Sequence, residues 1–321
     1  MFGQVVIGPP GSGKSTYCHG MYQFLSAIGR KSTIINLDPA NANLPYPSCS
    51  FDIRDYVCVE DIMQSHNLGP NGGLMFALES LSENALDSIM VAWDDLGKDS
   101  YLLFDCPGQV ELFTHHNAFF KIFKRLEKKA DARLCVVSLV DSLYLTSPSS
   151  YVSVLLLSLR SMLQLDLPHI NVISKIDKLH SYGKLAMRLD YYTEVQDLSF
   201  LGKFLQEESP SILGKNYVRL SEMIAELIED YNLVSFEVLA IENKQTMINL
   251  LQIIDKANGY AYGSTEVGGD SVWSQATRNG LSASSDIIDI HERWITNKDL
   301  YDRMEAERVS GDDDGSSCDE H

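Results

Sequence analysis

Short apolar runs alternate with amphipathic stretches along most of this chain of 321 residues. In the amphipathic stretches, apolar side chains recur every three or four residues, which is the spacing of one helix face. The runs themselves are apolar throughout, as expected of strands that are buried on both faces of a parallel sheet. Strands of this kind that alternate with helices indicate an α/β fold with a doubly wound, mostly parallel sheet. The predicted strands are 2–7, 32–37, 101–104, 134–140, 169–173 and 234–240.

Two longer stretches interrupt this alternation, at about 51–100 and 178–233, and both are predicted as helical insertions. The first begins with apolar residues at helical spacing over 51–66. It then reads Gly-Pro-Asn-Gly-Gly at 69–73, where the glycines predict an irregular loop shaped for close approach to another backbone, or a plain turn. In the second stretch, the apolar residues at helical spacing are Leu220, Met223, Ile224, Leu227 and Ile228.

The composition changes after about residue 263, where Gly, Ser, Thr and charged residues predominate. Residues 301–321 alone carry eight acidic and two basic side chains. A segment with so little apolar surface cannot offset the conformational entropy that ordering would cost. We therefore expect one folded domain over 1–262 and a disordered acidic tail over 263–321.

Composition and charge exclude several functional classes. Acidic residues outnumber basic ones 44 to 26, and the net charge of −18 argues against direct nucleic-acid binding, which needs clustered Lys and Arg. No apolar run approaches the roughly 18 residues of a membrane span. The first predicted strand begins at residue 2, which leaves no room for a leader, and the six cysteines lack metal-site spacing. We therefore expect a cytoplasmic protein without membrane contact.

The first candidate site directly follows the first predicted strand. Residues 8–15 read GPPGSGKS, which matches the phosphate-binding P-loop G-x-x-x-x-G-K-[ST]. Its glycines let successive backbone N–H groups turn toward an anion, its lysine supplies positive charge for the β- and γ-phosphates, and the hydroxyl of Ser15 is a ligand for Mg²⁺. The helix that follows points its positive end at the phosphates. The fold is therefore predicted to be a P-loop NTPase, with nucleotide contacts from Gly11, Ser12, Gly13, Lys14, Ser15 and Thr16.

Acidic residues at two further strand ends are candidates for metal and water binding. Asp105 and Gly108 form the D-x-x-G arrangement of guanine-nucleotide hydrolases, in which the Asp binds Mg²⁺ through water and the Gly N–H senses the γ-phosphate. Gln109 follows at once, where a water-positioning side chain belongs, and Glu111 is a second candidate for that role. Asp38 ends the strand 32–37 and can reach Mg²⁺ or its waters, unless it only forms an Asx turn before the next proline.

A candidate base-recognition motif follows the strand 169–173, where the chain reads Ser174-Lys175-Ile176-Asp177. The carboxylate of Asp177 can accept hydrogen bonds from both the N1–H and the exocyclic amine of guanine, which adenine cannot offer. The stem of Lys175 can pack along the base plane. The usual motif is N-K-x-D, so Ser174 replaces Asn, and an exposed Lys-Asp turn is the alternative. The motif predicts GTP as the nucleotide.

With these motifs in this order, the chain resembles the GPN-loop GTPases over roughly residues 2–262. The most specific marker is Gly-Pro-Asn-Gly-Gly at 69–73 combined with Asp-Cys-Pro-Gly-Gln-Val-Glu at 105–111. The resemblance implies a nucleotide-dependent dimer, either a homodimer or a heterodimer with a paralogue, whose two sites face each other. It also implies that Asn71 reaches the partner's γ-phosphate. Eukaryotic members are implicated in the assembly and nuclear import of RNA polymerase II, which implies RNA polymerase II subunits or assembly factors as partners and shuttling to the nucleus.

Three functions remain open at this point. The first is a dimerising GTPase that works as an assembly switch. The second is a P-loop kinase for a small molecule or a polynucleotide, although the Arg-rich lid of such kinases has little counterpart in 178–230, whose arginines are Arg188 and Arg219. The third is a scaffold that holds GTP without hydrolysing it.

Overall fold

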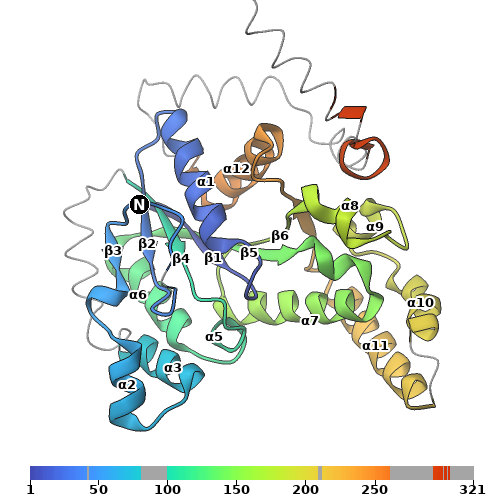
Figure 1. Ribbon diagram of the computed structural model, residues 1–321, viewed down its shortest axis with the longest axis horizontal. Helices are drawn as coiled ribbons and strands as arrows, with labels where there is room; N and C mark the ends of the chain where they lie inside the picture. The colour runs from blue at the N-terminus through green and yellow to red at the C-terminus, as the bar shows by residue number, and fades with distance from the viewer. Residues whose placement is uncertain are drawn as a thin grey trace, which may run out of the picture.

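The computed structural model describes residues 1–41, 43–80, 100–208, 212–260, 292–298, 300, 301 and 303. In this part of the chain the strands form one sheet of seven, in the order β3-β2-β4-β1-β5-β6-β7, and every neighbouring pair is parallel. The predicted doubly wound parallel sheet is thus confirmed (Figure 1). The strands are β1 (Phe2–Ile7), β2 (Ser32–Asn36), β3 (Phe51–Asp52), β4 (Tyr101–Asp105), β5 (Arg133–Asp141), β6 (His169–Ser174) and β7 (Phe236–Val238).

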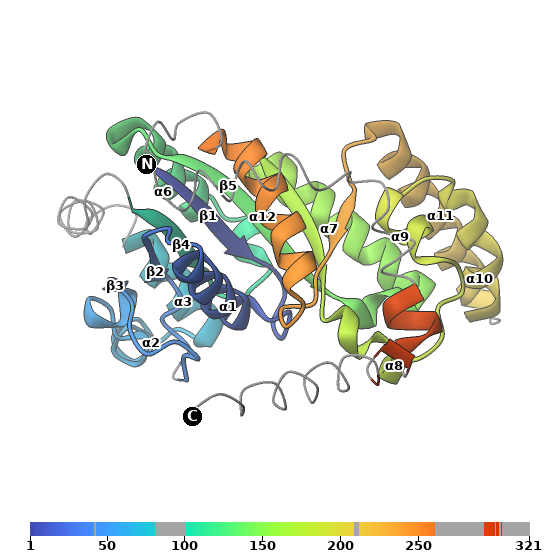
Figure 2. The same cartoon turned by 90° about the horizontal axis from the view of Figure 1, so that it is seen from above.

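Helices cover both faces of this sheet (Figure 2). On one face, α1 (Lys14–Ala27) and α12 (Lys244–Asn258) pack their apolar sides on the strands in one core cluster. On the other face lie α5 (Glu111–Thr114), α6 (Ala118–Ala130) and α7 (Pro148–Leu165), which contact one another. With both faces covered, the central strands are buried along their length, which explains why they are apolar runs and not alternating patterns.

The register of the strands brings the sequence motifs to one edge. Asp105, the last residue of β4, pairs with Val6 near the end of β1 and with Asn36 at the end of β2. On the other side of β1, Ser174 at the end of β6 pairs with Asp141 at the end of β5. All these strands are parallel, so their carboxyl ends meet at the edge where ligands bind in open α/β sheets.

The stretch 51–80 differs from its prediction at two points. Phe51–Asp52 is a strand at the sheet edge, and the helix α2 starts only later, at Val59–His66. The segment predicted as an irregular loop is helical, because α3 spans Pro70–Ser80 and its first turn holds the Pro-Asn-Gly-Gly residues. A Cβ on Gly73 would lie 2.8 Å from Met63 Cγ, so this glycine lets α2 and α3 pack closely. Residues 81–99 of the same predicted insertion lie outside the described residues.

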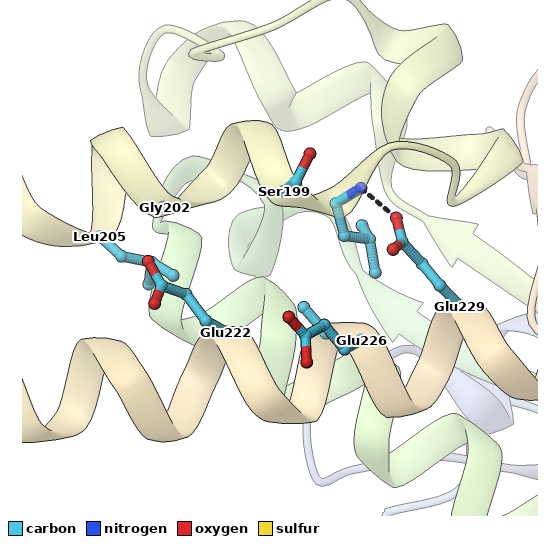
Figure 3. A pocket seen from close by; sticks show the side chains of 8 residues that line it. Ser199, Gly202, Leu205, Glu222, Glu226 and Glu229 are labelled. Carbon is cyan, nitrogen blue, oxygen red and sulfur yellow. Dashed lines mark hydrogen bonds between the residues drawn. The ribbon is translucent and has the colours of Figure 1, made fainter.

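The second insertion is helical, as predicted. It contains α8 (Leu179–Tyr182), α9 (Leu189–Glu194), α10 (Leu201–Glu208) and α11 (Ile212–Tyr231). Between α10 and α11 lies a pocket of about 170 Å³, and Figure 3 shows three glutamates of α11 along it. One of them, Glu229, accepts a hydrogen bond from the backbone N–H of Leu198. None of the described helices is both long and apolar enough to span a membrane.

Part of the predicted tail is folded onto the domain. Glu292–Thr296 forms a helical turn, η7, which contacts α8. Trp294 is only 8% exposed, in a core cluster shared with α7 and the second insertion. The prediction of a disordered tail is therefore wrong for this segment, since one aromatic side chain supplies the apolar surface that the average composition lacks. Residues 261–291 and 304–321 lie outside the described residues.

Candidate active site

The P-loop turns sharply between β1 and α1. Its backbone has a positive φ at Gly8, Gly11 and Gly13, with values of 146°, 79° and 91°. Residues with a Cβ rarely adopt such angles, and a Cβ on Gly8 would also lie 2.2 Å from the carbonyl oxygen of Leu139. Gly13 is the N-cap of α1, so the free N–H groups of the first helical turn face the loop. This loop and helix terminus have the geometry of the cradle predicted for phosphate oxygens.

Lys14 is the cation of this cradle. Its side chain is buried, and Nζ donates a hydrogen bond to the carbonyl oxygen of Pro9 at 3.2 Å. Burial lowers the pKa of Lys14 from its ordinary value, and the carboxylates of Asp105 and Asp38 oppose this shift. The ammonium group is thus held at the sheet edge between the P-loop and two acidic residues.

Asp105 and Ser15 lie together beneath the P-loop. The hydroxyl of Tyr46 donates a hydrogen bond to the Asp105 carboxylate at 3.0 Å, and the hydroxyl of Ser15 lies close enough to lower the pKa of that carboxylate. Burial raises the pKa of Asp105, while these two hydroxyls and Lys14 lower it. Asn41 donates to Ser15 Oγ at 3.4 Å. A hydroxyl and a carboxylate are hard oxygen ligands, so Ser15 and Asp105 fit the Mg²⁺ predicted for them.

Asp38 forms the Asx turn that was the alternative to a metal contact. Its Oδ1 accepts a hydrogen bond from the backbone N–H of Ala40 at 3.0 Å. The residue also lies close enough to Lys14 and Arg54 for both cations to lower its pKa, although burial raises that pKa by more. Arg54 itself pairs with Asp52 and donates to the carbonyl oxygen of Asn41. The Asx turn therefore explains the position of Asp38, and the negative charge of Asp38 still acts on Lys14 in the site.

Gln109, a candidate water-positioning residue, meets Asn71 at the N-terminus of α3. Gln109 Nε2 donates a hydrogen bond to Asn71 Oδ1 at 3.1 Å, within one chain. Asn71 is exposed and Gln109 half-buried. Glu111 lies two residues further on, exposed at the start of α5. Sequence reasoning had named these three residues separately, and the contact between Asn71 and Gln109 is new.

The base motif is fastened to the P-loop by side-chain contacts. Ser174 Oγ donates to the carbonyl oxygen of Ser12 at 2.8 Å. Lys175, in the left-handed conformation with φ 57°, donates from Nζ to the carbonyl oxygen of Gly11 at 2.5 Å and to Asp141 Oδ2 at 2.6 Å. The serine that replaces the usual asparagine therefore still links the two halves of the site. Sequence reasoning had not assigned a role to Asp141 or to Tyr46.

Asp177 stands in a short helical turn, η4 (Ile176–Lys178), directly after this link. No hydrogen bond or ion pair occupies its carboxylate among the residues that the structure describes. The carboxylate is thus available to the edge of a base. Its backbone carbonyl oxygen accepts a hydrogen bond from Lys298 Nζ at 2.6 Å. On the phosphate side, Thr16 is exposed in the first turn of α1.

Gly108 has no room for a side chain, which leads to a test. A Cβ there would lie 2.9 Å from Lys14 Nζ and 3.1 Å from Pro10 Cα. Gly108→Ala is therefore expected to displace the P-loop and to lower the rate of GTP hydrolysis about 10-fold or more. The matched control is Gly202→Ala, whose Cβ would meet the flexible side chain of Glu222, with Oε1 at 2.8 Å. Equal hydrolysis rates for the two variants would contradict the prediction.

Comparisons with known proteins agree on one family. A family model described as "Conserved hypothetical ATP binding protein" matches residues 6–260. GPN-loop GTPase 2 of Saccharomyces cerevisiae is 59% identical over 309 residues, which are 96% of this chain and 88% of that protein. GPN-loop GTPase QQT1 of Arabidopsis thaliana is 50% identical over 262 residues, 82% of this chain and 86% of that protein. A GTPase from Pyrococcus abyssi, solved in its apo form, has a TM-score of 0.61 and 25% identity, covering 80% of this chain and 97% of its own.

The description of the family model mentions ATP, whereas the relatives are named GTPases. The relatives carry more weight, because they are 59% and 50% identical over 96% and 82% of this chain and because the chain carries the S-K-x-D motif beside the P-loop. The resemblance to the family is thus confirmed, and the hypotheses of a P-loop kinase and of a non-hydrolysing scaffold are set aside. The chain belongs to the GPN-loop GTPases, and it is a GTPase.

Proposed function

We propose that this GTPase works as a nucleotide-dependent dimer, either a homodimer or a heterodimer with a paralogous GPN-loop GTPase. We further propose that the dimer is a switch for the assembly or nuclear import of RNA polymerase II, with its subunits or assembly factors as partners. This second part rests on the family resemblance alone. A protein with this role would act in the cytoplasm and shuttle to the nucleus.

The observation that carries the dimer proposal is the placement of Asn71. Gln109 donates a hydrogen bond to the amide oxygen of Asn71. Gln109 directly follows Gly108, where an added Cβ would lie 2.9 Å from Lys14 Nζ, so Asn71 is linked to the phosphate end of the site. Within the part of the chain that the structure describes, no hydrogen bond takes up the amide NH₂ group of the exposed Asn71, which can therefore donate to a neighbouring molecule. A donor delivered from a second subunit can stabilise negative charge on the phosphoryl group, while Gln109 and Glu111 position water.

Mg²⁺ is the metal that we propose for this site. Ser15 and Asp105 would hold it, and Tyr46 and Asn41 would fix their orientation through the hydrogen bonds described above. When bound, the ion supplies positive charge that neutralises the β- and γ-phosphates. Each of the two residues would supply one oxygen ligand, so replacing either with alanine is expected to weaken metal-dependent turnover.

Mixing two inactive variants tests whether Asn71 acts across a dimer. In a mixed dimer, an Asn71→Ala subunit keeps its P-loop and faces a Lys14→Ala subunit that keeps Asn71. Each variant alone is expected to be nearly inactive, and an equimolar mixture to recover about one quarter of wild-type turnover, because half of randomly formed dimers hold one working site. Mixed dimers are verified by capture through a tag on one variant.

The matched control mixes wild type with a double variant that carries both substitutions. If Asn71 acts in trans, the wild-type P-loop in a mixed dimer faces a partner without Asn71, and the mixed dimer is inactive. If Asn71 acts within its own subunit, the same mixed dimer keeps half of its activity. No recovery in the first mixture together with retained activity in the control would contradict the proposal.

A further inference from the structure

The folded part of the C-terminal segment lies beside the base motif. The turn η7 contacts α8, which directly follows η4 and Asp177 (Figure 2). The chain thus returns to the nucleotide site after α12, which ends at Asn258. This placement is not required by the P-loop or by the sheet, and it brings residues far along the chain to the guanine-specific end of the site.

Trp294 anchors this segment. Its side chain is 8% exposed and belongs to the core cluster that also includes Ile176 and Leu179, the residues on either side of Asp177 and Lys178. Ile295 packs against the same cluster. Ordering a short segment costs conformational entropy. Burial of a large aromatic side chain offsets this cost and so stabilises the docked position of the segment.

Lys298 then reaches the motif itself. Its Nζ donates to the backbone carbonyl oxygen of Asp177 at 2.6 Å, across 121 residues of sequence. A hydrogen bond from an ammonium group is shorter and stronger than a neutral one, and this one is partly buried. Lys175 is held from the P-loop side by Gly11 and Asp141. Asp177 is held by Lys298 of the C-terminal segment.

We infer that Lys298 is a positioning residue for guanine recognition, so that the C-terminal segment takes part in nucleotide selectivity. The inference rests on the assignment of Asp177 as the residue that reads the base. One carboxylate must meet two donors of guanine, and recognition of this kind tolerates displacements of only about 0.5 Å. By fixing the backbone of Asp177, Lys298 therefore keeps the carboxylate in place for both hydrogen bonds to guanine. Lys298 itself does not contact the nucleotide.

The comparison of GTP with inosine triphosphate separates this role from a merely structural one. Inosine lacks the exocyclic amine, so its triphosphate keeps one of the two hydrogen bonds to Asp177, and ATP keeps neither. Loosening Asp177 weakens GTP binding more than inosine triphosphate binding and leaves ATP binding unchanged. A general loss of stability would lower the unfolding temperature without changing these ratios.

The test uses the full chain with Lys298→Met, and Lys298→Arg as the variant that keeps a donor. Trp294 is left intact, so the anchor of the segment remains. Dissociation constants for the three nucleotides are measured by competition, together with the unfolding temperature. Lys298→Met is expected to reduce the preference for GTP over inosine triphosphate about 3-fold or more, and Lys298→Arg to restore most of it. Lys184→Met, which removes an exposed lysine two residues after α8, is expected to have no effect.

An unchanged preference in Lys298→Met would overturn the inference, even if the unfolding temperature fell. Asp177→Asn is measured in parallel to separate this failure from that of the base assignment. If Asp177→Asn changes the preference and Lys298→Met does not, only the role of Lys298 is wrong. If neither variant changes the preference, Asp177 does not recognise the base, and the inference about Lys298 is wrong together with the assignment of Asp177.

Discussion

Lys14→Ala is expected to abolish tight GTP binding. The buried ammonium group donates to the P-loop carbonyl of Pro9 and lies close to Gly108, where the β- and γ-phosphates belong. Its removal takes away the cation of the cradle and leaves the charges of Asp105 and Asp38 facing the triphosphate. We expect the dissociation constant to rise roughly 100-fold, which corresponds to about 2.7 kcal/mol and is within the range of charge-assisted hydrogen bonds.

Binding is measured by titration of a fluorescent GTP analogue in the presence of Mg²⁺. The control is Lys31→Ala, which removes an exposed lysine just before β2 and should leave the affinity unchanged. The unfolding temperature of both variants shows whether the fold is retained. Wild-type affinity in a folded Lys14→Ala variant would mean that residues 8–15 do not bind the phosphates.

The sheet could be predicted from the sequence because its central strands are buried on both faces. Such strands appear as apolar runs, and all those predicted are present. β3 was missed because Phe51–Asp52 is too short to show any period, and its position at the sheet edge depends on pairing with β2. Its neighbours Ile53 and Val57 suggested a helix that begins only at Val59.

Local propensity misled the prediction where tertiary packing decides the structure. The glycines at 69–73 predicted a loop, but Pro70 is well suited to the first turn of a helix, and Gly73 lets α3 approach Met63. The tail was predicted from average composition, which cannot show that Trp294 fits a specific core. In both places, a few contacts outweigh the preference of the segment as a whole.

The residues of the site follow from motifs, whereas their contacts do not. The P-loop, the D-x-x-G residues and the S-K-x-D motif each lie at the end of a strand, so their positions in a parallel sheet can be predicted, whereas Asn71 lies at the start of α3. The pairs Asn71 and Gln109, Tyr46 and Asp105, and Ser174 and Ser12 are separated by 38, 59 and 162 residues. Spacing within one sequence carries no information about such pairs, and only the folded arrangement shows them.

Asp177→Asn is expected to change the base preference of the enzyme from guanine to xanthine. The carboxylate accepts two hydrogen bonds, as the N1–H and the amine of guanine require, whereas an asparagine side chain offers one acceptor and one donor. Xanthine has a carbonyl in place of the amine and so matches asparagine. A mismatched buried polar edge leaves groups unpaired, and we expect the kcat/KM for GTP to fall roughly 100-fold or more.

The most direct test of guanine-specific hydrolysis is the kcat/KM of wild type and Asp177→Asn for GTP, ATP and xanthosine triphosphate. The wild type is predicted to prefer GTP over both other nucleotides, and the variant is predicted to prefer xanthosine triphosphate while its rate with ATP stays unchanged. Equal kcat/KM values of the wild type for GTP and ATP, or a variant that still prefers GTP, would contradict the assignment of this site.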